Sequence, residues 1–93
     1  MAKKNPEWLV LGEGFADITF SRTVTMGGVK MTSVRMREPT VEDSITTSEM
    51  EGSDALREVH AIANLVEHSP EDIRKLGMRD FRRLQMAYLS FID

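Results

Sequence analysis

The chain has 93 residues, of which 41% are hydrophobic and 29% are charged, and its net charge is −3. This composition excludes a disordered or low-complexity chain and predicts one globular domain over residues 1–93, with a core so small that a partner or an oligomer would add to its stability. The absence of cysteine excludes disulfides and cysteine-based metal or catalytic sites, and it is compatible with the cytoplasm.

Residues 1–14 are predicted to be either flexible or to contain one short extra strand. Their apolar run WLVL, at residues 8–11, is too brief for a signal peptide or a membrane span. We therefore expect an intracellular protein without a membrane segment. A Gly-Glu-Gly sequence at residues 12–14 would end the extra strand.

Residues 15–38 predict an antiparallel hairpin. Their apolar residues alternate with polar ones, which is the two-residue period of a half-buried strand. Gly27 and Gly28 interrupt the pattern and supply the positive φ angles of a tight turn. The parity of the alternation changes between Met31 and Val34, which predicts a β-bulge with one extra residue in this second strand.

Pro39 marks the junction between the hairpin and a helical part over residues 40–93. Proline cannot donate a hydrogen bond to a sheet, so it ends the strand. The Thr40 hydroxyl can accept a backbone N–H at a helix start while Asp43 reaches back to the cap, which is a capping box. The helix that follows, toward Met50, should be short because its threonines and serine have poor helical propensity.

Three more helices are predicted after this junction. Ser53 begins a central helix with a broad apolar stripe, which includes Leu56. Ser69 caps a helix of about two turns that ends at Gly77. The last helix begins near Met78, and its inward residues are Phe81, Leu84, Tyr88 and Phe91, with Leu89 and Ile92 widening the stripe. The predicted fold class is therefore α+β, an N-terminal hairpin or three-stranded sheet followed by about four short helices.

The sequence offers no constellation typical of an enzyme, a cofactor site or a metal site. His60 and His68 have no third nitrogen or sulfur ligand for a transition metal. The acidic pairs at residues 42–43 and 71–72 lie at predicted helix starts, where the helix dipole explains them. We therefore predict a protein that is not an enzyme and that binds no cofactor.

A basic face near the C-terminus supports an alternative function as a small nucleic-acid-binding regulator. Acidic residues are interleaved with it, which is more typical of a solvated helix face than of a phosphate site. Residues 39–68 are strongly acidic, and no third of the chain supplies a basic stripe, so nucleic acid is disfavoured. The basic face consists of Arg74, Lys75, Arg79, Arg82 and Arg83.

The chain contains seven methionines, a residue that is used both as core filler and on adaptable binding surfaces. Met86 lies beside the inward stripe of the last helix. Together with Leu89 and Ile92 it forms a candidate partner-binding strip, and ordinary core packing is the alternative that the sequence leaves open. The open edge of the hairpin is a second candidate, because unpaired backbone groups can accept a partner strand.

Four motifs occur in order along the chain: DITFSR at residues 17–22, GVK at 28–30, VRMREPTVED at 34–43 and LGMRDFRRLQ at 76–85. This set resembles the tail assembly chaperones of contractile-tailed phages and Mu-like prophages, over roughly residues 15–92. One departure is Thr23, at a position where members often have proline. Six residues are expected to serve caps and junctions rather than binding: Arg37, Pro39, Thr40, Asp43, Ser69 and Asp80.

The resemblance implies a function and a set of partners. It implies a non-enzymatic chaperone that binds the long helical tape-measure protein, keeps it soluble and helps the tail tube protein to polymerise around it. It also implies a longer form made by ribosomal frameshifting, whose extension recruits the tube protein. Such a chaperone is absent from the mature virion and resides in the cytoplasm of the bacterial host.

Overall fold

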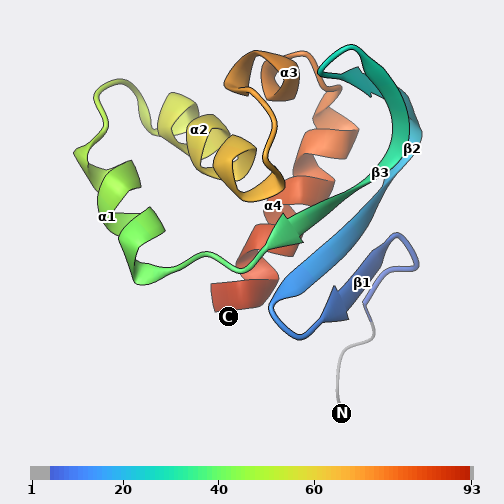
Figure 1. Cartoon of the computed structure of the whole chain (residues 1–93), viewed down its shortest axis with the longest axis horizontal. Helices are drawn as coiled ribbons and strands as arrows, with labels where there is room; N and C mark the ends of the chain where they lie inside the picture. Colours follow the sequence, from blue (N-terminus) through green and yellow to red (C-terminus); the bar gives the residue numbers. More distant parts are fainter. Residues whose placement is uncertain (1–4, 93) are drawn as a thin grey trace.

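The computed structural model describes residues 5–92 (Figure 1). Residues 1–4, which belong to the segment 1–14 that is predicted to be either flexible or a short strand, lie outside the described residues. The elements are β1 (Leu9–Gly12), β2 (Phe15–Met26), β3 (Val29–Arg37), α1 (Val41–Glu49), α2 (Asp54–Val66), α3 (Pro70–Arg74) and α4 (Met78–Ile92). This order confirms the predicted α+β arrangement, including the short third strand and four helices.

The three strands form one antiparallel sheet in the order β1-β2-β3. Gly27 and Gly28 connect β2 to β3 with φ angles of 62° and 78°, which are the positive values that the tight turn requires. In Figure 1 the long β2–β3 hairpin curves around the helices, and α2 and α4 lie on its concave side. The apolar residues on that side of β2 are buried, as their alternation predicts: Ala16, Ile18, Phe20 and Met26.

The pairing of β2 with β3 is irregular where the parity change predicts a bulge. Thr19 lies opposite Ser33 and Val24 lies opposite Met31. The extra residues are therefore in β2, and the prediction that β3 carries one extra residue is wrong. A parity change along one strand locates an irregularity but does not say which strand is longer there.

Helices α2 and α4 contribute most of the buried helical residues of the core. Ile62 and Leu65 of α2 and Leu84 and Ala87 of α4 are fully or almost fully buried. Burial of one such large side chain contributes roughly 1.5–3 kcal/mol. The central position of α2 agrees with the prediction, since it packs against α1, α3, α4 and β3. The prediction that Leu56 belongs to the inward apolar stripe of this helix is wrong, because its side chain lies in the first turn of α2 and is 39% exposed.

Helix α1 is attached to the body of the protein differently from the others. It buries none of its residues, and its packing neighbour is α2 (Figure 1). The predicted capping box is present, with Thr40 as the N-cap and Asp43 as its partner. Polar contacts at its first turn, rather than apolar burial, therefore hold α1 in place. Within residues 5–92 no helix has the length and apolar character needed to cross a bilayer.

Candidate functional site

A buried carboxylate on helix α4 forms hydrogen bonds to the irregular part of β2. Asp80 is 2% exposed, and its Oδ1 accepts a 2.7 Å hydrogen bond from the backbone N–H of Ser21. Its Oδ2 accepts a second bond, of 3.1 Å, from the Ser21 hydroxyl. Ser21 lies in the stretch between Thr19 and Val24 where β2 has no paired residue on β3, and the carboxylate supplies the acceptor for its N–H. Asp80 thus joins helix to sheet, and its partner could not be predicted from local sequence.

A second contact of α4 involves Arg83, a member of the basic face. Arg83 donates from Nη1 to the carbonyl oxygen of Thr19 at 2.7 Å. Its guanidinium also lies over the ring of Trp8, 5.0 Å from the centroid. The Arg83 guanidinium therefore already has partners within the protein. The other four members of the basic face are exposed.

The candidate strip on α4 is exposed, which excludes the core packing that the sequence left open as an alternative. Met86, Leu89 and Ile92 are 47%, 56% and 60% exposed. The expectation that Leu89 and Ile92 widen the inward stripe is wrong. At 100° per residue, Leu89 lies about 140° around the helix from Leu84, which is beyond the reach of α2 and the sheet. Ala87 takes the core position instead, and its small side chain gave little signal in the sequence.

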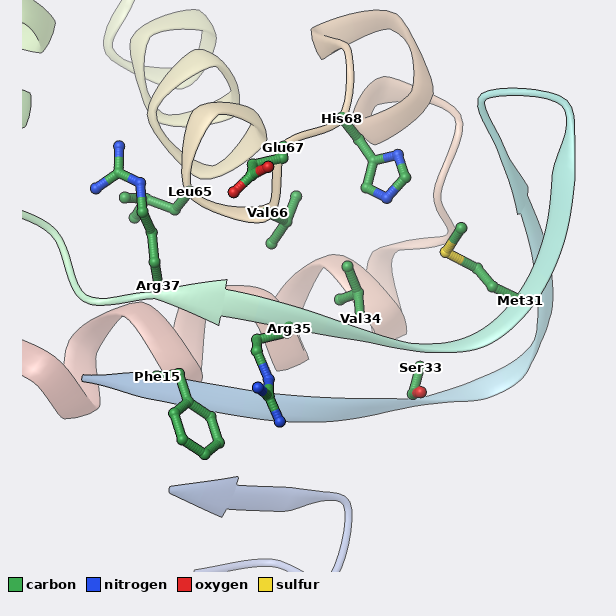
Figure 2. A pocket seen from close by; sticks show the side chains of 10 residues that line it. All are labelled: Phe15, Met31, Ser33, Val34, Arg35, Arg37, Leu65, Val66, Glu67 and His68. Atoms are coloured by element: carbon green, nitrogen blue, oxygen red, sulfur yellow. The ribbon is translucent and has the colours of Figure 1, made fainter. Parts of the chain in front are cut away.

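The second candidate surface is a groove of about 530 Å³ between β3 and the end of α2. Figure 2 shows Val34 and Val66 pointing into the space between the two elements, with Glu67 at its upper side. Glu67 ends α2 with a φ of 59°, a left-handed conformation that glycine more often supplies. The groove is lined by Phe15, Met31, Ser33, Val34, Arg35, Arg37, Leu65, Val66, Glu67 and His68.

The free edge of β3 runs along this groove. The N–H of Glu38 donates to the carbonyl of Gly14, so this pair is hydrogen-bonded. In an antiparallel ladder hydrogen-bonded pairs alternate with non-hydrogen-bonded pairs. Counting back from Glu38, the non-hydrogen-bonded positions of β3 are Arg37, Arg35 and Ser33, so their backbone N–H and C=O groups point away from β2. The groove therefore has the polar backbone pattern of an open sheet edge.

Both arginines beside this edge are held by carboxylates. Arg35 pairs with Asp17, at 2.8 Å from Nε to Oδ1, and its guanidinium lies 4.0 Å from the centroid of the Phe15 ring. The hydrogen bond from Arg35 lowers the pKa of Asp17. Phe15 in turn covers Gly12, where a Cβ atom would collide with the ring. These contacts link β3 to β2 and β2 to β1 through their side chains.

Asp43 joins β3, α1 and α2. It accepts bonds of 2.7 and 3.0 Å from Arg37, one of 2.8 Å from the backbone N–H of Thr40 and one of 3.2 Å from Asn64 Nδ2. The Arg37 guanidinium, followed by the Thr40 backbone N–H, holds the pKa of the Asp43 carboxyl well below its usual range. Pro39 lies in the connection between β3 and the α1 cap. The junction is therefore formed by four residues close in sequence: Arg37, Pro39, Thr40 and Asp43.

Helix α3 is tied to the tip of the hairpin. Ser69 is its N-cap and accepts from the backbone N–H of Asp72 at 3.2 Å. The Asp72 carboxylate accepts from the N–H of Gly27 at 2.9 Å. No group of three histidine, aspartate or glutamate side chains suited to a metal ion occurs within residues 5–92. The three sets of contacts made by Asp80, Asp43 and Asp72, here called the polar locks, hold the helices to the sheet.

Comparison with known proteins supplies one match. A family model described as phage tail assembly chaperone proteins, E, or 41 or 14, matches residues 17–93. No curated protein and no solved structure matches the chain. The matched stretch begins within β2 and extends through α4, so it includes the strip, the β3 edge and the polar locks, while β1 precedes it.

Proposed function

The chain belongs to the family of phage tail assembly chaperones, and we propose that it binds the tape-measure protein of its phage or prophage and keeps it soluble while the tail tube assembles. In this proposal the protein acts without catalysis, in the cytoplasm of the host, and is absent from the mature virion of a contractile-tailed phage. The tail tube protein is a second proposed partner, reached through a longer frameshifted form. The family match and the resemblance of the motifs support these points.

The exposed strip of Met86, Leu89 and Ile92 is the observation that carries the proposal. Apolar residues that recur along the outer side of a helix can receive the apolar stripe of a partner helix. Methionine adapts to partners of different shape, which suits a chaperone that binds many segments of one long protein. A tape-measure helix bound here would bury apolar area on both chains.

The test is the double substitution Met86→Glu, Leu89→Glu. Both side chains are at the surface, so the variant should melt cooperatively and within about 1 kcal/mol of the wild type. Co-expressed tape-measure protein should then lose its soluble, co-purifying fraction, because two carboxylates would have to be desolvated on binding, at roughly 2 kcal/mol or more each. The measurement is the amount of tape-measure protein recovered on the tagged chaperone.

A matched control is Val41→Glu, Ile45→Glu on α1, whose side chains are 79% and 46% exposed. This variant places the same two charges on exposed apolar positions of another helix and should still hold the tape-measure protein. If the α4 variant folds and retains the partner, the binding surface is elsewhere, and the groove along β3 is the next candidate. If the α4 variant does not fold, these residues contribute to the core.

The alternative function, nucleic-acid binding through the basic face, receives less support. Arg83 is occupied by Thr19 and Trp8, which removes one of the five cations. Binding to a phosphate backbone depends on several cations acting together and weakens steeply with salt. Elution from heparin at low salt is the expected result, and late elution with a steep salt dependence would favour the alternative.

A further inference from the structure

The outer side of α4 carries a regular seam that extends beyond the apolar strip. Arg79, Arg82, Met86 and Leu89 follow one another at intervals of three, four and three residues, and all four are exposed. At 100° per residue they fall within about 80° of the helix circumference. This is the spacing with which one helix packs along another in a coiled coil. The buried residues Asp80, Leu84 and Ala87 lie on the opposite side.

The seam has two chemically different halves. Its C-terminal half is apolar, and its N-terminal half consists of Arg79 and Arg82. Among residues 5–92 neither arginine takes part in an ion pair, and neither side chain makes a hydrogen bond within the protein, in contrast to Arg83 beside them. The neighbouring acid, Asp80, is buried against Ser21 and does not balance them. Two exposed cations thus continue directly from an exposed apolar surface.

We propose that the seam binds a partner helix in which carboxylates adjoin an apolar stripe, with the carboxylates opposite Arg79 and Arg82 and the apolar residues opposite Met86 and Leu89. This inference rests on the proposed function and defines the segments of the tape-measure protein that the chaperone selects. Charge complementarity sets the register and direction of the bound helix, and the apolar half supplies most of the affinity. Apolar helices without adjoining carboxylates bind more weakly.

The decisive variant is Arg79→Glu, Arg82→Glu. Arg79 lies in the first turn of α4, where an acidic side chain is favourable, and Arg82 is exposed, so α4 should remain folded. The matched control, Arg74→Glu, Lys75→Glu, makes the same change in net charge at exposed residues in and just after α3, outside the helix that carries the seam. Retention of co-expressed tape-measure protein is measured during washes at about 50 mM and about 500 mM NaCl, between which exposed ion pairs become screened.

At low salt the seam reversal should weaken retention about tenfold, because two attractive pairs become repulsive, while the control stays within about twofold of the wild type. High salt should weaken retention by the wild type, and it should restore part of the retention lost in the reversed variant, because salt screens the repulsion as well. Equal losses in seam and control variants would show a general charge effect and overturn the inference, and so would undiminished retention by the reversed variant. If the reversed variant fails to melt cooperatively, Arg79→Gln, Arg82→Gln replaces it and should lose the salt dependence.

Two further outcomes separate this inference from the proposed function. A wild-type protein that does not hold the tape-measure protein would refute the proposed function itself. Loss of retention in the Met86→Glu, Leu89→Glu variant, together with normal retention after reversal of Arg79 and Arg82, would refute only the inference about carboxylates. Binding of a fluorescent DNA duplex that depends on the two arginines would assign them to phosphate instead.

Discussion

Replacing Asp80 tests how the sheet and the last helix are joined. Ser21 lies in the stretch of β2 between Thr19 and Val24 that has no paired residue on β3, and Asp80 accepts its N–H at 2.7 Å. Asp80→Ala removes this acceptor and also the 3.1 Å bond from the Ser21 hydroxyl. Asp80→Asn keeps the volume and one acceptor oxygen, so it separates the charge of the carboxylate from its geometry.

The expected loss can be worked out from these contacts. A hydrogen bond to a charged acceptor contributes about 1.5–3 kcal/mol, and a neutral hydroxyl bond adds about 1 kcal/mol. Two effects oppose the loss: alanine removes the cost of burying a carboxylate, and the exposed Ser21 can be hydrated in part. We therefore expect Asp80→Ala to lower the free energy of unfolding by about 2 kcal/mol, or about 8–16 °C in Tm, and Asp80→Asn by about 1 kcal/mol.

Urea denaturation followed by far-UV circular dichroism measures both variants. The m value should stay constant, since the folded state keeps its compactness. Glu51→Ala serves as the control, because Glu51 is an exposed acid in the loop before α2 and should change stability by less than about 0.5 kcal/mol. A loss of less than about 0.5 kcal/mol for Asp80→Ala would refute the reasoning, since water would then satisfy Ser21 as well as the carboxylate does.

Two further predictions concern the α1 junction. Thr40→Ala removes the α1 cap and should speed hydrogen exchange of the α1 amides about fivefold, or about 1 kcal/mol, with a smaller change in the urea midpoint because α1 buries no residue. Unchanged exchange would show that the hydroxyl does not hold the helix start. The pKa of Asp43 is lower in the folded protein than in the unfolded chain, so its contribution to stability is present above about pH 4 and is lost as the pH falls toward the folded value. Urea midpoints of the wild type and Asp43→Asn should therefore differ at neutral pH and converge below about pH 4, and a constant difference down to about pH 2 would contradict this.

The features that could be predicted from the sequence depend on neighbouring residues. The Thr40–Asp43 capping box, the Ser69 cap and the Gly27-Gly28 turn each depend on contacts within about four positions. The alternation along β2 predicts which of its residues are buried for the same reason, since successive side chains of a strand point to opposite faces. The resemblance of the ordered motifs adds the family, which the match over residues 17–93 shows.

The features that could not be predicted join residues far apart in the chain. Asp80 binds Ser21 and Arg83 binds Thr19 across separations of 59 and 64 residues, and no local pattern contains either partner. Which strand carries the extra residues at the bulge depends on the pairing of two strands and not on either strand alone.

The sequence by itself determined the order of the strands and helices of this protein and where most of them begin, because caps, turns and periodicity act over a few residues. It also placed Met86 and Leu89 at the margin of an amphipathic helix. Only the tertiary structure decided that they are exposed, because burial depends on where α2 and the sheet stop covering α4, and that limit is set by the packing of Leu84 and Ala87. The same packing turns Arg79 and Arg82 outward and directs Arg83 to Thr19 and Trp8.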